Sequence, residues 1–548
     1  MRSPILTSLA AALCLALVAP DAALAAQASK GQPRVPTFVE EAASAGVEHT
    51  YDGGFEFYVG GGVAVFDCDG DGRPELFFAG GEVPAALYRN RSRKGKRLRF
   101  ERLESEVTDL TAVTGAYPLD IDSDGNGDLV VLRHGENVLL RGLGSCTFER
   151  ANEEWGFDGG NDWTTAFSAT WQDGRAWPTL AFGNYVDHFD EQHLAHCAPG
   201  ALYPPAAGDR GFAPATALEP GRCALSLLFS DWDRSGRRDL RVSNDRHYYY
   251  NEGGEQLWQI PLDGPPRLYT AQDGWQPVRI FGMGIGTADV TGDGYPEYYL
   301  ANIGSNRLET LASGRSVPVF EDIAYDHGIS ATTPWIGKPV DPSTSWHPEF
   351  DDVNNDGRLD LYISKGNVDA AGDSALKDPN ELFLGLADGT FRRAAKQAGI
   401  RSPIRTRGAA LVDLNQDGLL DLVEVNRYEN VSLRRNLGAG TARKPKAMGR
   451  WLEVRPTQSG VNPDAVGAWI EVRAGEQLTT REVTVGGGHA GGALGPVHFG
   501  LGQQETAEVR VTWPDGEVGE WRAVDADQVV TVERETVSAP GSRGAETG

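Results

Sequence analysis

Short apolar runs bounded by Gly, Asp or Asn recur along most of the chain. They include VAVF (63–66), LFFA (76–79), LVVL (129–132), YYLA (298–301) and LYI (361–363). Such short runs between turn-forming residues indicate buried β-strands, because an amphipathic helix would show a longer segment with a period near 3.6 residues. The pattern therefore predicts an all-β protein.

An acidic turn separates many of these runs, and it is repeated. The pattern D-x-[DNT]-x-[DS]-G-x-x-[DE] begins at residues 67, 120, 231, 289, 352 and 413, and a degenerate copy at 171 keeps one carboxylate, Asp173. Successive copies are 53, 51, 60, 58, 63 and 61 residues apart. A unit of this length can form one four-stranded blade, and radial repetition gives propellers of about 4 to 8 blades. We therefore predict a seven-bladed β-propeller over residues 38–445.

The last part of the chain has a different pattern. Residues 449–535 alternate apolar and polar positions in WLEVRP, AWIEVRA, REVTVGG, AEVRVTW and QVVTVER. A period of two is typical of half-buried strands, so a small antiparallel β module is expected after the propeller. Residues 438–449 are the expected connector, and residues 536–548 are expected to be a disordered tail.

The N-terminus has the pattern of a secretory signal peptide over residues 1–25. Arg2 precedes an apolar run from Ile5 to Val18, and the small residues Ala23 and Ala25 follow. This pattern predicts cleavage near Ala25 and export, either to a periplasm or outside the cell. No later segment approaches 18 uninterrupted apolar residues, so no membrane span is expected.

Export permits disulfides, and four cysteines follow the signal peptide. Cys197 and Cys223 border a segment rich in Pro and Gly and are the favoured pair, while Cys68 and Cys146 are assigned no state. Metal ligation by these thiols is the weaker alternative because no CxxC spacing occurs.

The net charge is −26, from 77 acidic and 51 basic residues. A nucleic-acid backbone would be repelled by this charge, so nucleic acid is not an expected partner. Multivalent cations fit better, although an acidic surface that only favours solubility is an alternative.

The repeated turns have the chemistry of calcium sites. Calcium takes about 6 to 8 oxygen ligands, which a tight loop can supply from alternate residues and one backbone carbonyl. In the first turn, Asp67, Asp69 and Asp71 would converge, the carbonyl of Arg73 would add a ligand, and Glu75 would close the site. Magnesium demands stricter octahedral geometry, and the turn differs from an EF-hand because strands flank it.

The same logic extends to five further turns and predicts up to six Ca²⁺ ions. Their expected ligands are Asp120, Asp122, Asp124, Asn126 and Asp128; Asp231, Asp233, Ser235, Arg237 and Asp239; Asp289, Thr291, Asp293, Tyr295 and Glu297; Asp352, Asn354, Asp356, Arg358 and Asp360; and Asp413, Asn415, Asp417, Leu419 and Asp421. The copy at 171 should bind no ion. The alternative for any single copy is a solvated turn.

These repeats resemble the FG-GAP/VCBS repeats of integrin-α-like propellers. The segment FGNYVDHFD (182–190), with the cysteine-bordered excursion after it, looks like a stretch of cartilage-acidic-protein-like secreted proteins. NPDAVGAWIEV (462–472), GPVHFGLG (495–502) and VRVTWPDG (509–516) are similar to the ASPIC/UnbV domain, which is named partly for proteins of enediyne gene clusters. Two departures from the family pattern are the third repeat, which has lost its ligands, and Ser235, which replaces the usual acid.

The leading hypothesis is a secreted calcium-binding propeller that acts as a binding or adhesion scaffold for an extracellular protein or glycan, as a monomer. The resemblance also implies an alternative, an enzyme or accessory protein of secondary metabolism, and a purely structural extracellular protein is a third hypothesis. A non-catalytic role is favoured because the chain has no G-x-S-x-G elbow, no H-E-x-x-H and no Walker loop.

Several histidines and one basic run also suggest specific roles. His489 in GGGHAGG is expected on the surface of a glycine-rich hairpin, whereas His498 is expected to pack in a strand. His193 and His196 beside Cys197 suggest either surface histidines or a zinc trio, of which the first is favoured. The basic run RNRSRKGKRLRF (89–100) is interpreted as a solvated loop, with an acidic glycan or surface polymer as the alternative partner.

Overall fold

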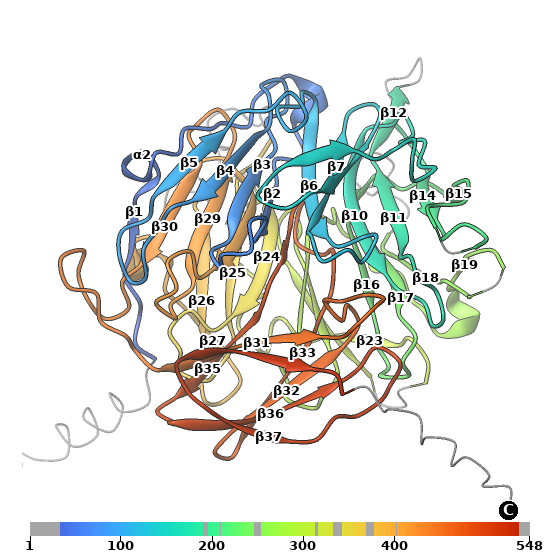
Figure 1. Cartoon of the computed structure of the whole chain (residues 1–548). Helices are drawn as coiled ribbons and strands as arrows, with labels where there is room; N and C mark the ends of the chain where they lie inside the picture. Colours follow the sequence, from blue (N-terminus) through green and yellow to red (C-terminus); the bar gives the residue numbers. More distant parts are fainter. Residues whose placement is uncertain are drawn as a thin grey trace, which may run out of the picture. The chain divides into compact units, whose positions relative to one another are not determined.

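The computed structural model describes residues 33–189, 195–208, 210–245, 254–262, 264–312, 316–332, 342–368, 378–401 and 403–535 (Figure 1). The elements below all belong to the unit Arg34–Gly548. The predicted signal peptide, the predicted disordered tail and His193 lie outside the described residues.

The fold is all-β, and seven sheets follow one another along the chain. The first holds β2 (Val63–Phe66), β3 (Glu75–Phe78), β4 (Ala86–Asn90) and β5 (Phe100–Leu103); the second β6 (Val113–Leu119), β7 (Asp128–Arg133), β8 (Val138–Gly142) and β9 (Phe148–Arg150); the third β10 (Thr164–Thr170), β11 (Thr179–Asn184), β14 (Gly200–Tyr203) and β15 (Thr216–Leu218); and the fourth β16 (Ala224–Ser230), β17 (Asp239–Asn244), β18 (Gln256–Gln259) and β19 (Arg267–Leu268).

The remaining three sheets repeat this order. The fifth holds β20 (Ile285–Ala288), β21 (Glu297–Leu300), β22 (Arg307–Leu311) and β23 (Phe320–Asp322); the sixth β24 (Ser345–Asp351), β25 (Asp360–Lys365), β26 (Glu381–Gly385) and β27 (Phe391–Arg393); and the seventh β28 (Thr406–Val412), β29 (Asp421–Asn426), β30 (Ser432–Asn436) and β1 (Phe38–Glu40). The N-terminal strand β1 thus completes the last sheet by pairing antiparallel with β30. A hairpin of β12 (Val186–Phe189) and β13 (Ala195–Cys197) extends from the third sheet.

The first strands of the seven sheets contact one another in a propeller-like arrangement. Each contacts the first strand of the next sheet, and β28 contacts β2. First strands such as β6, β10 and β16 are buried along their whole length, whereas last strands such as β9 and β23 are largely exposed. Second strands such as β3, β21 and β25 are also buried along their whole length, which explains why the apolar runs there are continuous and not alternating.

Short helices occur in the described part of the chain, namely α2 (Ala42–Ala45), α4 (Ala395–Ala398) and the 3-10 turns η1 (Phe55–Phe57) and η2 (Ala271–Asp273). None of the helices in this part has the length and hydrophobicity that a membrane crossing requires.

The C-terminal module has two sheets that enclose a core of residues such as Leu452, Ile470 and Val509. One sheet holds β31 (Arg450–Thr457), β35 (Val497–Gly502) and β38 (Gln528–Glu533), and the other β32 (Trp469–Ala474), β33 (Gln477–Glu482), β36 (Thr506–Thr512) and β37 (Arg522–Asp525). The expectation of a wholly antiparallel module is wrong, because β31 and β38 pair in parallel. The two strands are far apart in the sequence, so the chain crosses to the other sheet before it returns in the same direction.

One part of the module leaves it and lies among the first strands of the propeller-like sheets. This glycine-rich segment (residues 485–494) follows β33 and ends in β34 (Gly492–Leu494), which pairs in parallel with β2 (Figure 1). Its backbone also bridges Ala116 in β6, Ala169 in β10, Leu228 in β16 and Ile285 in β20. The segment therefore joins first strands from at least five sheets.

Glycines on both sides make this close approach possible. A Cβ atom at Gly62, or at Gly115 in β6, would overlap the carbonyl oxygen of Ala490. His489, which directly precedes Ala490, is fully buried, so the expectation of a surface histidine on a hairpin is wrong. The glycines allow backbone to pack on backbone, and this packing surrounds the imidazole.

Candidate functional site

The six acidic loops connect the first and second strands of six sheets and share one hydrogen-bond pattern. In each loop the glycine at the sixth position donates its N–H to the first aspartate, over 2.6 to 3.0 Å. The pairs are Gly72 and Asp67, Gly125 and Asp120, Gly236 and Asp231, Gly294 and Asp289, Gly357 and Asp352, and Gly418 and Asp413. These bonds curl each loop around its own first carboxylate.

The fifth and seventh positions are also joined in all six loops. The residues that were expected to ligate through their carbonyl donate their backbone N–H to the fifth-position side chain. These residues are Arg73, Asn126, Arg237, Tyr295, Arg358 and Leu419.

The last acid of each loop is the first residue of the second strand, and in four loops its carboxylate ties the loop backbone to the third strand. In the first loop, one Glu75 oxygen accepts the N–H of Cys68 at 2.9 Å and the other accepts the N–H of Asn90 at 3.1 Å. The same pair of hydrogen bonds, one to the loop and one to the third strand, is made by Asp128, Asp360 and Asp421. The last acid is thus a structural brace whatever else it binds.

Carboxylates gather inside the first two loops as the sequence predicts. One oxygen from each of Asp67, Asp69 and Asp71 lies within 4.8 Å of the others, and Asp120, Asp122 and Asp128 form a second such group. The Oδ1 atoms of Asp69, Asp122 and Asp289 are buried and have no hydrogen-bond partner. Unpartnered buried carboxylate oxygens that converge in a tight turn fit a hard divalent cation.

The remaining predicted residues are placed less uniformly. At the third position, Thr291, Asn354 and Asn415 stand where the first two loops have aspartate, so fewer carboxylates meet in those loops. In the acidic loop of the fourth sheet, Asp239 already accepts hydrogen bonds from Trp232, Tyr269 and Arg237. Asp173 in the degenerate third turn is exposed.

Burial and nearby carboxylates raise the pKa values of three of these acids in particular. Burial, followed by neighbouring carboxylates, raises the pKa of Asp120 to about 7, and burial with Asp356 nearby does the same for Asp352. Burial raises the pKa of Glu75 to about 8. A bound cation would replace the lost hydration and favour the ionised forms.

The acidic loops are also where the C-terminal module docks. Glu482 accepts the backbone N–H of Asp231 at 2.9 Å, and Ser123 Oγ accepts the N–H of Asn462 at 3.2 Å. His498 lies 2.8 Å from Asn355, between an imidazole nitrogen and the amide oxygen. His498 is buried, as expected for a strand residue.

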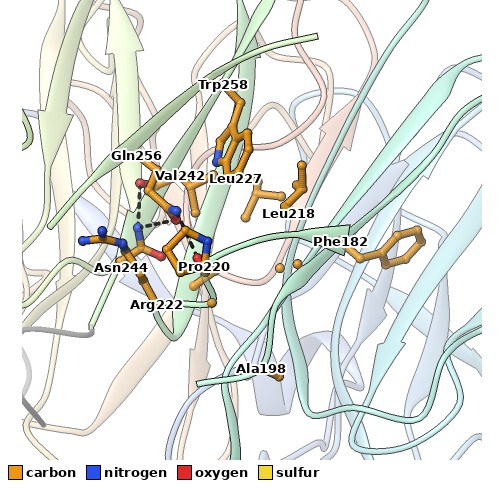
Figure 2. Close-up of a pocket in the computed structure, with 14 residues that line it drawn as sticks. Phe182, Ala198, Leu218, Pro220, Arg222, Leu227, Val242, Asn244, Gln256 and Trp258 are labelled. Atoms are coloured by element: carbon orange, nitrogen blue, oxygen red, sulfur yellow. Dashed lines mark hydrogen bonds between the residues drawn. The ribbon is translucent and has the colours of Figure 1, made fainter. Parts of the chain in front are cut away.

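A cavity of about 670 Å³ lies between these loops and the module. Its lining includes Phe350 and Leu411 from the first strands and Trp451, Arg455 and Asp464 from the module. This volume is in the range of small-molecule sites. A second cavity, between the third and fourth sheets, measures only about 10 Å³ and is lined by Phe182, Leu227 and Trp258 (Figure 2). It has room for no more than one water molecule.

Two disulfides are present. One joins Cys197 to Cys223, the pair that the sequence favours. The other joins Cys68, inside the first acidic loop, to Cys146 between β8 and β9, and only the even cysteine count hinted at it. Because Cys197 is oxidised, it cannot complete a zinc trio with His193 and His196.

Comparisons with known proteins agree with this geometry. Residues 67–131 and 352–424 match the FG-GAP-like repeat family, and residues 458–539 match the ASPIC and UnbV family. The chain carries FG-GAP-like repeats and an ASPIC and UnbV domain. The FG-GAP-like ranges contain four of the six acidic loops, and the ASPIC and UnbV range contains most of the C-terminal module.

Curated relatives align with most of the chain. Cartilage acidic protein 1 from Homo sapiens is 25% identical over 83% of this chain and 69% of its own length. The protein of that name from Xenopus tropicalis is 25% identical over 83% of this chain and 70% of its own length.

Two solved structures show weaker likeness. BBS1N in complex with ARL6DN gives a TM-score of 0.40 at 9% identity, and covers 76% of this chain and 100% of that chain. AofleA from Arthrobotrys oligospora gives a TM-score of 0.33 at 11% identity, and covers 62% of this chain and 86% of that chain.

Proposed function

We propose that this protein is an extracellular, calcium-stabilised β-propeller of seven blades that acts as a binding scaffold. Its C-terminal module would dock on the calcium loops and complete the scaffold. The observation that carries the proposal is the shared hydrogen-bond pattern of six acidic loops, together with the unpartnered buried oxygens of Asp69, Asp122 and Asp289.

The seven blades are supported by the succession of four-stranded sheets. Contacts run from each first strand to the next and return from β28 to β2, and β1 completes the seventh sheet. An extracellular location is supported by the two disulfides and by the similarity to cartilage acidic protein 1.

A protein or glycan partner is supported by the architecture. Loops on a rigid frame commonly carry binding sites, because the frame holds them in place. The frame is itself braced, because Glu75, Asp128, Asp360 and Asp421 each tie their loop to the third strand of the same sheet. Bound calcium would stiffen the loops further, and with them the cavity beside Asp67 and Asp413.

Elemental analysis of the dialysed protein tests the calcium sites. We expect up to six Ca²⁺ per chain, and the double variant Asp67→Asn and Asp71→Asn should lose about one ion. Asp173→Asn is the matched control, because the degenerate turn should hold no ion. Protein without bound calcium at millimolar free Ca²⁺, or equal losses from both variants, would overturn the proposal.

A further inference from the structure

The loop between β4 and β5 presents a dense group of positive side chains. In this basic hairpin (residues 91–99), the side chains of Arg93, Lys94, Lys96, Arg97 and Arg99 are exposed, while Ser92 and Leu98 are buried. No carboxylate among the described residues lies within 4.0 Å of these five cationic groups. The neighbouring Arg91, by contrast, pairs with Glu101 at 2.9 Å.

The backbone of the basic hairpin is held by hydrogen bonds, although the five cationic side chains named above form no ion pair with a described residue. The N–H of Gly95 donates to the carbonyl of Asn415 at 2.9 Å, and the Asn415 amide donates back to the carbonyl of Lys96 at 2.9 Å. The N–H of Leu98 donates to Glu41 at 3.0 Å. These bonds hold the turn, so little backbone entropy is lost when a ligand binds.

The local charge is opposite to that of the chain. Five cations within seven residues repel one another, and the acidic net charge of the chain, −26, does not neutralise them locally because no described carboxylate lies within 4.0 Å of their charged groups. A ligand with several anionic groups would relieve this repulsion. The planar guanidinium group of arginine can also donate paired hydrogen bonds to two oxygens of one carboxylate or sulfate group.

The charges beside the basic hairpin favour a linear polymer over a flat anionic surface. The exposed acids Glu101 in β5 and Glu104 just after it follow the hairpin in the chain. A lipid bilayer would bring its charge close to these acids, within a Debye length of about 8 Å at physiological salt. A single polymer chain covers a narrower area and can contact the five bases without approaching these acids.

From these observations we infer that the basic hairpin binds a linear polysaccharide that bears sulfate or carboxylate groups. This inference deepens the proposed scaffold function by naming a partner class, and it would fail separately from the calcium sites because its test reads polysaccharide affinity and not metal content.

The test measures binding of the full calcium-loaded chain to immobilised heparin and to polygalacturonate, which separate sulfate from carboxylate recognition. The variant R93S/K96S/R97S should lose about tenfold or more in affinity for the preferred polymer, with a weaker salt dependence. The control R210S/R279S/K396S removes three exposed bases from other sheets and should stay within about twofold.

Thermal unfolding of both variants checks that the fold is intact. Anionic phospholipid vesicles and double-stranded DNA serve as competitors in the same assay. Equal affinity of the two variants, no binding by the unmodified protein to either polysaccharide, or tighter binding to vesicles or DNA would each overturn the inference.

Discussion

The backbone N–H of His489 donates to Nδ1 of His347 at 3.0 Å, and so links the glycine-rich segment of the C-terminal module to β24. The His489 ring in turn accepts the N–H of Gly60 at 3.2 Å and lies 5.0 Å from the Trp346 ring, between centroids. The position of this histidine, which lies in the C-terminal part of the chain, is thus set by contacts with Gly60 and with Trp346 and His347, which are far from it in the sequence.

This burial should make stability fall in mild acid. Burial, with Arg407 and His347 nearby, lowers the pKa of His489 from 6.5 to about 3. Between these pH values the unfolded chain binds a proton that the folded chain does not, so the free energy of unfolding falls as pH falls below 6.5. His489→Gln should remove about 2 kcal/mol of the stability difference between pH 7 and pH 5.

Chemical denaturation at the two pH values measures this difference. His188→Gln is the control, because the His188 side chain is exposed. If His489→Gln retains the full difference between pH 7 and pH 5, His489 is not the group responsible.

The fully buried Asp245 should have the opposite effect. Burial raises its pKa from 3.8 to about 7, and one of its oxygens accepts the hydroxyl of Tyr185 at 2.7 Å. The folded chain therefore keeps a proton that the unfolded chain releases, and stability falls as pH rises from 3.8 to about 7. Asp245→Asn should gain about 2 kcal/mol relative to the unmodified protein between pH 5 and pH 8. Thermal unfolding of the variant and of the unmodified protein across this pH range measures the gain. If plots of Tm against pH are parallel for the two proteins, the Asp245 carboxyl does not titrate as a buried group.

Close backbone contact predicts a sharp difference between glycines. Gly62→Ala should destabilise the protein by about 3 kcal/mol, because the added Cβ overlaps the Ala490 carbonyl. Gly495, just after the glycine-rich segment, has open space around its Cβ position, so Gly495→Ala should change stability by less than about 0.5 kcal/mol. Urea titration of both variants tests this, and similar losses in the two would argue against the packing.

The two disulfides should contribute different amounts to the free energy of unfolding. Cys68 and Cys146 are 78 residues apart, and Cys197 and Cys223 are 26 apart. In the chain-entropy model, loss of the longer loop costs about 4.5 kcal/mol and loss of the shorter one about 3.5 kcal/mol. Paired Cys→Ser variants, each compared with the unmodified protein in denaturant, give the order. The reverse order would show that local strain or unfolded-state structure outweighs loop length.

The sequence predicts features that depend on near neighbours. The acidic turns, the flanking strands and the alternation in the module all come from residues within about ten positions of one another, and the structure places them as expected. Local sequence patterns do not predict the Cys68–Cys146 disulfide or the hydrogen bond from Tyr269 to Asp239. Each joins residues that meet only after the sheets assemble.

GGGHAGG shows the limit most clearly. Three glycines before a polar residue have the composition of a turn, and the same glycines are needed wherever two backbones touch. Only the partner distinguishes the two cases, and here the partners include Gly62 and Gly115, more than 370 positions earlier.

The position of the glycine-rich segment also sets the order in which the molecule can mature. A ribosome releases residues 485–494 only after all seven sheets have been synthesised, and β1 must likewise wait for β30. The first strands of at least five sheets therefore lack these backbone partners until the glycine-rich segment has been made, so the propeller-like sheets and the C-terminal module complete their folding together.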